Sequence, residues 1–310
     1  NYTDGYPPTI NHKKQSENVL EAAKKVSILD SMSLRARLVV EGYIIGQHRS
    51  PFHGFSVEFA EHRSYEPGDE IRHIDWKLYG KTDRLYVKRY EEETNLSSHI
   101  ILDISKSMIF SSNKISKLNY ANTLVAALSY LMIKQQDAVG LVQFSNQIDS
   151  FLLPKSRPSH LSSILDKLDD DKFGQDTQIE KILHEMAERI VKRGLVILIS
   201  DLIDDQQKIL NGLKHFRHNK QEVIVFHLFD RKELEFDFSD RTKFVDMETG
   251  EEITTEPWHI RSNYKDLISK KQKYFRAKCQ ENLIDYFSIV TDQSLEFCLT
   301  EYLRKRKNLG

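Results

Sequence analysis

The sequence predicts an α/β protein built on a doubly wound, mostly parallel sheet. Short runs such as 98–102, 195–200 and 222–229 are mainly apolar, as expected for strands that are buried on both faces. Segments with helical periodicity alternate with these runs, and this alternation is typical of a parallel sheet covered by helices. The chain has 310 residues, of which 39% are hydrophobic, and this is enough for a core of that size.

The elements of the sheet are expected in a regular order after residue 97. A turn at Thr249-Gly250 within the charged segment 231–256 indicates an inserted hairpin. The expected strands are 98–102, 138–144, 148–153, 195–200, 222–229 and 284–290. The expected helices are 117–134, 161–168, 179–191, 206–216, a helix through 264–275, and 295–303.

The residues before the sheet are expected to form an N-terminal helical and strand-rich section. Helical stripes are expected at 16–29 and, more weakly, at 34–45, whereas alternating apolar residues and a Pro67-Gly68 turn predict short strands within 54–93. Trp76 is expected to be a packing anchor in this section. The predicted organisation is therefore a loose tail at 1–15, this section at 16–97, and a sheet domain at 98–310.

The composition excludes several classes of protein. Lys and Arg number 45 against 46 Asp and Glu, a net charge of −1, which argues against a chain that coats nucleic acid or an anionic membrane. No run of 18 apolar residues is present, so no membrane span is expected in this chain. The two cysteines, Cys279 and Cys298, lack metal-ligand spacing and are expected to be free thiols in a reducing compartment, which points to a cytoplasmic location.

Oxygen-bearing side chains follow the ends of the predicted strands. Asp103, Ser105 and Ser107 come directly after the first strand, Asp201 directly follows the strand 195–200, and Thr177 precedes a helix between them. Ligands of doubly wound sheets bind beyond the carboxyl ends of the strands, so these five side chains are expected to converge. Carboxylates and hydroxyls form an all-oxygen set that suits a hard cation such as Mg²⁺, with Mn²⁺ or Ca²⁺ as alternatives. For the first three residues alone, a turn that caps the next helix is the competing interpretation.

This pattern resembles the metal-ion-dependent adhesion site of von Willebrand factor A domains. The resemblance implies a Rossmann-type, von Willebrand factor A-like domain over residues 98–305 and a cation with a free position for a carboxylate of another protein. Asp176 departs from the pattern, because an extra acid beside Thr177 could attract the ion. Lys106 and Asp176 are expected to lie at the rim of the site.

The block from Gly54 to Lys77, which includes Arg63, Pro67-Gly68 and Asp75-Trp76, resembles the signature of the domain of unknown function 58 family. That resemblance implies association with AAA+ ATPases of the MoxR type in chaperone-like assembly, and no established catalytic activity. The block itself is expected to form a structural network of ion pairs that holds the small strand unit on the sheet domain, with a partner-docking surface as the alternative.

The sequence therefore predicts a non-catalytic module that binds a partner carboxylate through a divalent cation, with a MoxR-type ATPase or its client as the partner. The alternative is a metal-dependent hydrolase or phosphatase that uses Asp103, although the second acid usual two residues later is replaced by Ser105. A site that binds no metal inside a structural subunit is a third possibility. Nucleic-acid binding through the basic runs 270–273 and 304–307 is not expected.

Overall fold

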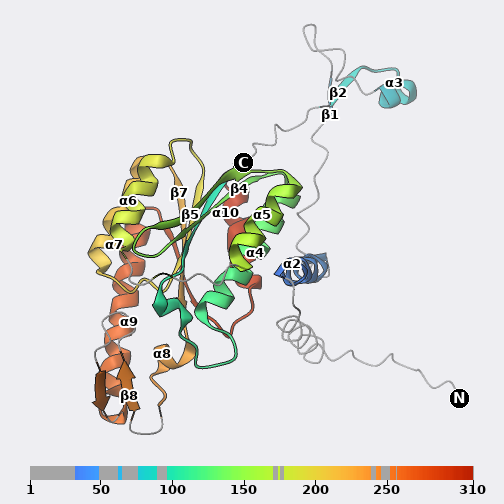
Figure 1. Cartoon of the computed structure of the whole chain (residues 1–310). Coiled ribbons are helices and arrows are strands. Elements are labelled where there is room, and N and C mark those ends of the chain that lie inside the picture. Colours follow the sequence, from blue (N-terminus) through green and yellow to red (C-terminus); the bar gives the residue numbers. More distant parts are fainter. Residues whose placement is uncertain are drawn as a thin grey trace, which may run out of the picture.

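Six strands form the central sheet of the computed structural model, in the order β10-β7-β6-β3-β4-β5 (Figure 1). The structure describes residues 32–48, 62–64, 76–88, 96–169, 174, 178–238, 242–245, 252–255 and 257–309. The strands of the sheet are β3 (Ser97–Asp103), β4 (Ala138–Phe144), β5 (Ile148–Lys155), β6 (Leu195–Ser200), β7 (Glu222–Phe229) and β10 (Asp285–Val290).

The sheet is doubly wound and mostly parallel, which confirms the predicted fold class. Only β5 runs antiparallel to its neighbour, and the other pairs are parallel. Numbered along the chain, the strands lie in the order 3-2-1-4-5-6, so the direction of winding reverses between β3 and β6. This reversal places the ends of β3 and β6 side by side, at the crevice where such sheets bind ligands.

Helices cover both faces of the sheet because successive side chains of each strand point to opposite faces. Ile100 and Leu102 belong to one hydrophobic core, whereas Ile101 between them belongs to the other. The first core is covered by α2 (Met32–His48), α4 (Lys117–Lys134), α5 (Pro158–Asp169) and α10 (Glu296–Lys307). The second is covered by α6 (Ile179–Arg189), α7 (Gln206–His218) and the last turns of α9 (Pro257–Glu281).

The segment after β7 contains a helix that the sequence analysis missed. The hairpin is confirmed as β8 (Thr242–Val245) and β9 (Glu252–Thr255), but the short helix α8 (Arg231–Glu235) precedes it. Asp230 caps this helix and forms a capping box with Glu233, which explains why five residues are enough. The following helix α9 is also much longer than the predicted segment.

The front section differs from its prediction in one element. Two strands, β1 (His62–Ser64) and β2 (Tyr86–Lys88), pair antiparallel, but a helix, α3 (Trp76–Thr82), lies between them in the chain. The prediction that Trp76 is a packing anchor is wrong, because 58% of its surface is exposed and its ring meets Tyr79 edge-on at 6.1 Å. The expected tail and the helix at 16–29 lie outside the described residues.

Candidate metal and partner-binding site

Asp103 lies at the end of β3 and has a fully buried carboxylate. Its Oδ1 accepts a hydrogen bond from the Ser105 backbone N–H at 2.9 Å, and its Oδ2 accepts one from the Ser200 hydroxyl at 2.6 Å. Ser200 is the last residue of β6, so this bond joins the two strands at the point where the winding reverses. The position expected from the sequence is therefore the position that the structure shows.

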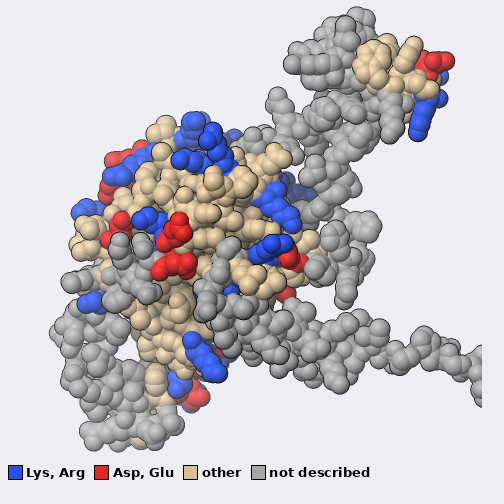
Figure 2. All heavy atoms as spheres, turned by 45° about the vertical axis from the view of Figure 1, so that its right-hand side comes forward, with Lys and Arg blue, Asp and Glu red and all other residues tan. Residues whose placement is uncertain are grey.

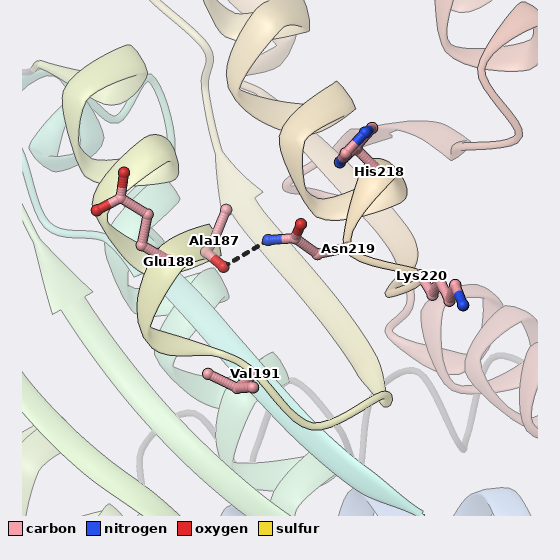
Figure 3. Close-up of a pocket in the computed structure, with 6 residues that line it drawn as sticks. All are labelled: Ala187, Glu188, Val191, His218, Asn219 and Lys220. Atoms are coloured by element: carbon pink, nitrogen blue, oxygen red, sulfur yellow. Dashed lines mark hydrogen bonds between the residues drawn. The ribbon is translucent and has the colours of Figure 1, made fainter.

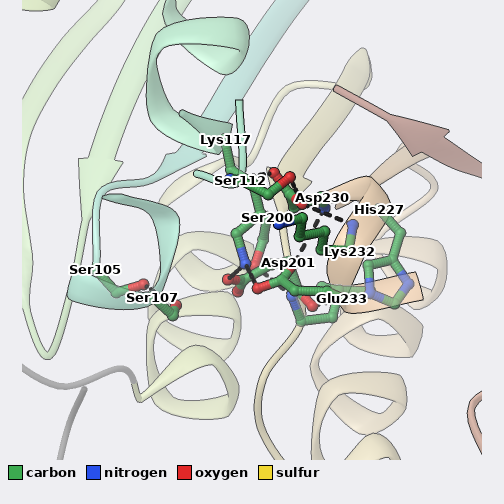
Figure 4. Close-up of polar contacts among 11 residues, drawn as sticks. Ser105, Ser107, Ser112, Lys117, Ser200, Asp201, His227, Asp230, Lys232 and Glu233 are labelled. Atoms are coloured by element: carbon green, nitrogen blue, oxygen red, sulfur yellow. Dashed lines mark hydrogen bonds and ion pairs between the residues drawn. The ribbon is translucent and has the colours of Figure 1, made fainter. Parts of the chain in front are cut away.

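Ser105 and Ser107 lie in the turn that follows Asp103. Both are buried, and their Oγ atoms are 3.0 Å apart, within hydrogen-bonding distance of each other. Ser105 is the N-cap of a single 3₁₀ turn, η2 (Lys106–Ile109), and Ser107 lies within this turn. Figure 4 shows the two hydroxyls side by side, to one side of the charged cluster around Asp201.

Asp201 follows β6 and is paired with a buried lysine. The Lys117 ammonium lies 2.9 Å from Asp201 Oδ2 and 2.7 Å from Glu233 Oε1 (Figure 4). Lys117 is the first residue of α4, and its side chain has no exposed surface. Burial alone lowers the pKa of Lys117, but the two carboxylates outweigh it, so the net pKa is raised and the ammonium stays charged.

His227 on β7 holds the Asp201 backbone in place. Its Nε2 lies 2.8 Å from the Asp201 carbonyl oxygen and its Nδ1 lies 2.7 Å from the Tyr286 hydroxyl. A carbonyl oxygen only accepts, so Nε2 carries the proton and donates, while Nδ1 accepts from Tyr286. Burial lowers the pKa of His227 to about 4, which keeps the ring neutral.

Negative charge is only partly compensated in this cluster. Burial, followed by repulsion from Asp201, raises the pKa of Asp103 to about 7, against the opposing hydrogen bonds from Ser200 and Ser105. Burial also raises the pKa of Glu233, although the Lys117 ammonium opposes the shift. A second positive charge close to Asp103 would lower its pKa and relieve this repulsion.

Four of the five predicted ligands thus lie at one end of the sheet. Asp103, Ser105 and Ser107 share one loop, and Asp201 is near enough to Asp103 for their charges to interact. Thr177 lies outside the described residues. Among the residues that the structure does describe, no three His, Cys, Asp or Glu side chains gather as metal ligands, so a cation bound to this loop would depend on hydroxyl oxygens.

Lys117, Glu233 and Asp230, the charged partners of this site, were not predicted from the sequence. The buried ion pairs of Lys117 could not be predicted locally, because in the sequence it is an ordinary first residue of a helix. Asp230 did have a local signal, since it follows β7 just as Asp201 follows β6. Its carboxylate accepts hydrogen bonds from the Ser112 backbone N–H, at 2.9 Å, and from the Ser112 hydroxyl. Together with Lys117 and Glu233, it fastens α8 to the loop ahead of α4.

Comparison with protein families decides where the chain belongs. The model described as "Protein of unknown function DUF58" matches residues 61–274, which is more than half of the chain. The chain belongs to the DUF58 family. Uncharacterized proteins of Mycobacterium bovis and Mycobacterium tuberculosis are 19% identical over 249 residues, covering 79% of this chain and 77% of theirs. The predicted resemblance to this family is thereby confirmed, and the match includes residues 61–77 of the block that suggested it.

Solved structures with a similar arrangement include two proteins of Bacteroides. One is an aerotolerance-related membrane protein from Bacteroides fragilis, with a TM-score of 0.49 and 17% identity, covering 68% of this chain and 99% of that one. Another is BatB from Bacteroides thetaiotaomicron, with a TM-score of 0.46 and 19% identity over 69% and 99%. The VWA domain of SpRpn10 has a TM-score of 0.40 and 14% identity, covering 66% of this chain and 95% of that one. The fold of this DUF58 chain, von Willebrand factor A-like and Rossmann-type, is defined by its own strand order.

No helix among the described residues combines the length and apolar character needed to cross a bilayer.

Proposed function

We propose that this DUF58 protein is a non-catalytic interaction module that binds an acidic side chain of a partner protein through a divalent cation, with Mg²⁺ as the first candidate. The observation that carries the proposal is the clustering of Asp103, Ser105 and Ser107 beside Asp201 at the switch point of the sheet. Oxygen donors of this kind suit hard cations.

The charge of the cluster supports a cation of more than one positive charge. The Lys117 ammonium contacts two carboxylates, those of Asp201 and Glu233, and the buried carboxylate of Asp103 is repelled by Asp201 without a cation of its own among its described contacts. Charges that are buried without compensation are costly, and here the imbalance appears as the raised pKa of Asp103. A divalent cation would compensate it and retain positive charge for the carboxylate of a partner.

Each residue has a distinct role in the proposal. Asp103, Ser105 and Ser107 would hold the ion from one loop, and Asp201 would act directly or through water. Thr177 would complete the set from the neighbouring loop. Lys117 competes with the ion for Asp201, and a partner's Asp or Glu would take a free coordination position. Lys106 and Asp176 would shape the rim.

The identity of the partner rests on the family resemblance. We propose a MoxR-type AAA+ ATPase or its client, in a chaperone-like assembly role, because that is what the Gly54–Lys77 block implies. A purified MoxR-type ATPase should bind the chain in Mg²⁺ and be released by EDTA.

Calorimetric titration with Mg²⁺ tests the ion itself. The parent chain should give a saturable heat, and Ser105→Ala should weaken binding by about tenfold or more, because it removes one of few neutral oxygen donors. Ser162→Ala, on the exposed face of α5, is the matched control and should leave the titration unchanged. Absence of heat in the parent would leave the fold without a metal-dependent function.

The competing phosphatase reading predicts release of phosphate from an aryl phosphate in Mg²⁺ or Mn²⁺. We expect no release above background. A rate that disappears in Asp103→Asn would replace the interaction proposal with an enzymatic one.

A further inference from the structure

The edge of the sheet opposite the candidate metal site carries unpaired positive charge. This amino edge consists of the α6–β6, α7–β7 and α9–β10 connections and the end of α10. The strands that these connections enter are parallel neighbours, and Leu195 of β6 is level with Glu222 of β7, so the connections emerge at one side of the sheet. Lys305 places the end of α10 there, since its ammonium lies 2.7 Å from Glu222 and 3.1 Å from Asp285.

Several cations of the amino edge have no acidic partner in the described part of the chain. Arg189, Arg217, Lys305 and Arg306 are each paired with a carboxylate. Other exposed cations of the edge form no such pair; these are Lys192, Arg193, Lys220 and Lys307. Figure 2 shows blue side chains gathered at the top of the sheet domain, the end at which Figure 1 places the C-terminus.

Two of the same connections also expose aliphatic side chains. Val191 is 83% exposed and Leu283 is 70% exposed, the two highest values among the large hydrophobic residues that the structure describes. Each borders a shallow hollow. The first, of about 280 Å³, is lined by Val191 with Ala187, Glu188, His218, Asn219 and Lys220 (Figure 3). The second, of about 320 Å³, is bordered by Leu283.

Backbone conformation at these turns is strained. Lys220 and Leu283 have φ angles of 61° and 57°, in the left-handed region that glycine usually occupies after a helix. A non-glycine residue there costs roughly 1 kcal/mol, so neither a lysine nor an exposed leucine is explained by local stability. Gln136, after α4, has a similar φ angle of 63°, so the strain alone does not assign a function, and the exposure of the side chains carries the argument.

We propose that the amino edge docks onto an anionic lipid bilayer. Its unpaired cations would lie against acidic headgroups, while Val191 and Leu283 enter the headgroup region. The charges and aliphatic groups are spread over several connections and do not line one groove. This arrangement suits a fluid lipid surface better than a single acidic peptide. The net charge of −1 conceals this polarity, because acids such as Asp201 and Asp230 lie at the opposite end. Docked in this way, the candidate metal site would face away from the bilayer.

Flotation of the 310-residue chain with vesicles tests the proposal without any divalent cation, so its result is independent of the metal proposal. We expect binding to phosphatidylcholine vesicles that contain phosphatidylserine, little binding to phosphatidylcholine alone, and release at high salt. Lys192→Glu with Arg193→Glu should lower the partition coefficient by about tenfold or more. The control Lys208→Glu with Lys270→Glu reverses two exposed charges away from the edge and should have little effect.

A pair of glycine variants separates membrane binding from stability. Leu283→Gly removes the exposed side chain and relieves the strained φ angle, so it should keep or raise stability and weaken vesicle binding. Asp83→Gly, with a φ angle of 50° directly after α3 and outside the sheet, relieves the same strain and should not weaken vesicle binding. No binding to anionic vesicles at low salt, or equal binding by the Lys192/Arg193 variant, would overturn the proposal. Binding of an acidic protein without vesicle binding would assign the edge to a protein partner.

Discussion

Replacing Lys117 by methionine isolates the charge of a lysine whose side chain has no exposed surface. Methionine keeps most of the apolar stem in place, so the main change is the loss of the ammonium between Asp201 and Glu233. These carboxylates lie 2.9 and 2.7 Å from it, and removing one member of a buried ion pair costs about 3–5 kcal/mol. Since small domains are stable by about 5–15 kcal/mol, this is a large fraction of the total.

Urea unfolding followed by circular dichroism at neutral pH measures this loss through the shift in midpoint at constant slope. Adding Glu233→Gln to Lys117→Met should recover about 1 kcal/mol or more, because one of the two unpaired charges is then removed. Lys208→Met, at an exposed position on α7, is the control and should change stability by no more than about 0.5 kcal/mol. A loss below about 1 kcal/mol in Lys117→Met, or no recovery in the double variant, would refute the described role of Lys117.

Three further outcomes follow from the structure. In the absence of metal, the raised pKa of Asp103 adds to the stability of the fold below about pH 4, and this contribution is lost as the pH rises toward about 7. Urea unfolding of the parent should therefore show a lower free energy of unfolding at pH 8 than at pH 5. The decrease should be smaller in Asp103→Asn, which has no carboxyl group to titrate. Gly194→Ala should destabilise the chain by about 1–3 kcal/mol in thermal unfolding, because its new Cβ would lie 2.2 Å from the Ser97 carbonyl oxygen; an unchanged midpoint would contradict the close approach. Burial raises the pKa of Cys279 and of Cys298 to about 12, so neither thiol should react with a thiol reagent at pH 8 until the protein unfolds, and rapid labelling of the folded chain would argue against their burial.

The sheet could be predicted from the sequence because its strands carry their own signal. The runs 138–144, 195–200 and 222–229 are confirmed to the residue, since a strand buried on both faces is mainly apolar from end to end. Their alternation with helices then limits the topology to few arrangements. The helix 117–134 is confirmed in the same way, with Ser116 as its cap.

Short and polar elements could not be predicted with the same rules. The helices α3 and α8 have too few residues for a periodic pattern, and α8 depends on the capping interactions of Asp230. Trp76 shows that residue type alone does not predict burial, because a seven-residue helix offers little surface to pack against.

The candidate site was predictable only in its oxygen donors. Asp103 and Asp201 could be placed because strand ends meet at one edge of a parallel sheet. The pairing of Lys117 with Glu233 joins residues more than a hundred positions apart, and no local pattern reports such a contact. The metal role of the five predicted ligands stays a prediction, as do the domain boundaries.

The contacts between α8 and the start of α4 connect the β8–β9 hairpin segment to the candidate site. Glu233 of α8 and its cap Asp230, which precede the β8–β9 hairpin, contact Lys117 and Ser112, and Lys117 also pairs with Asp201. A displacement of α8 would therefore act directly on these polar contacts. Loss of the Lys117 ammonium would remove the contact of α8 at Glu233 and leave the one between Asp230 and Ser112.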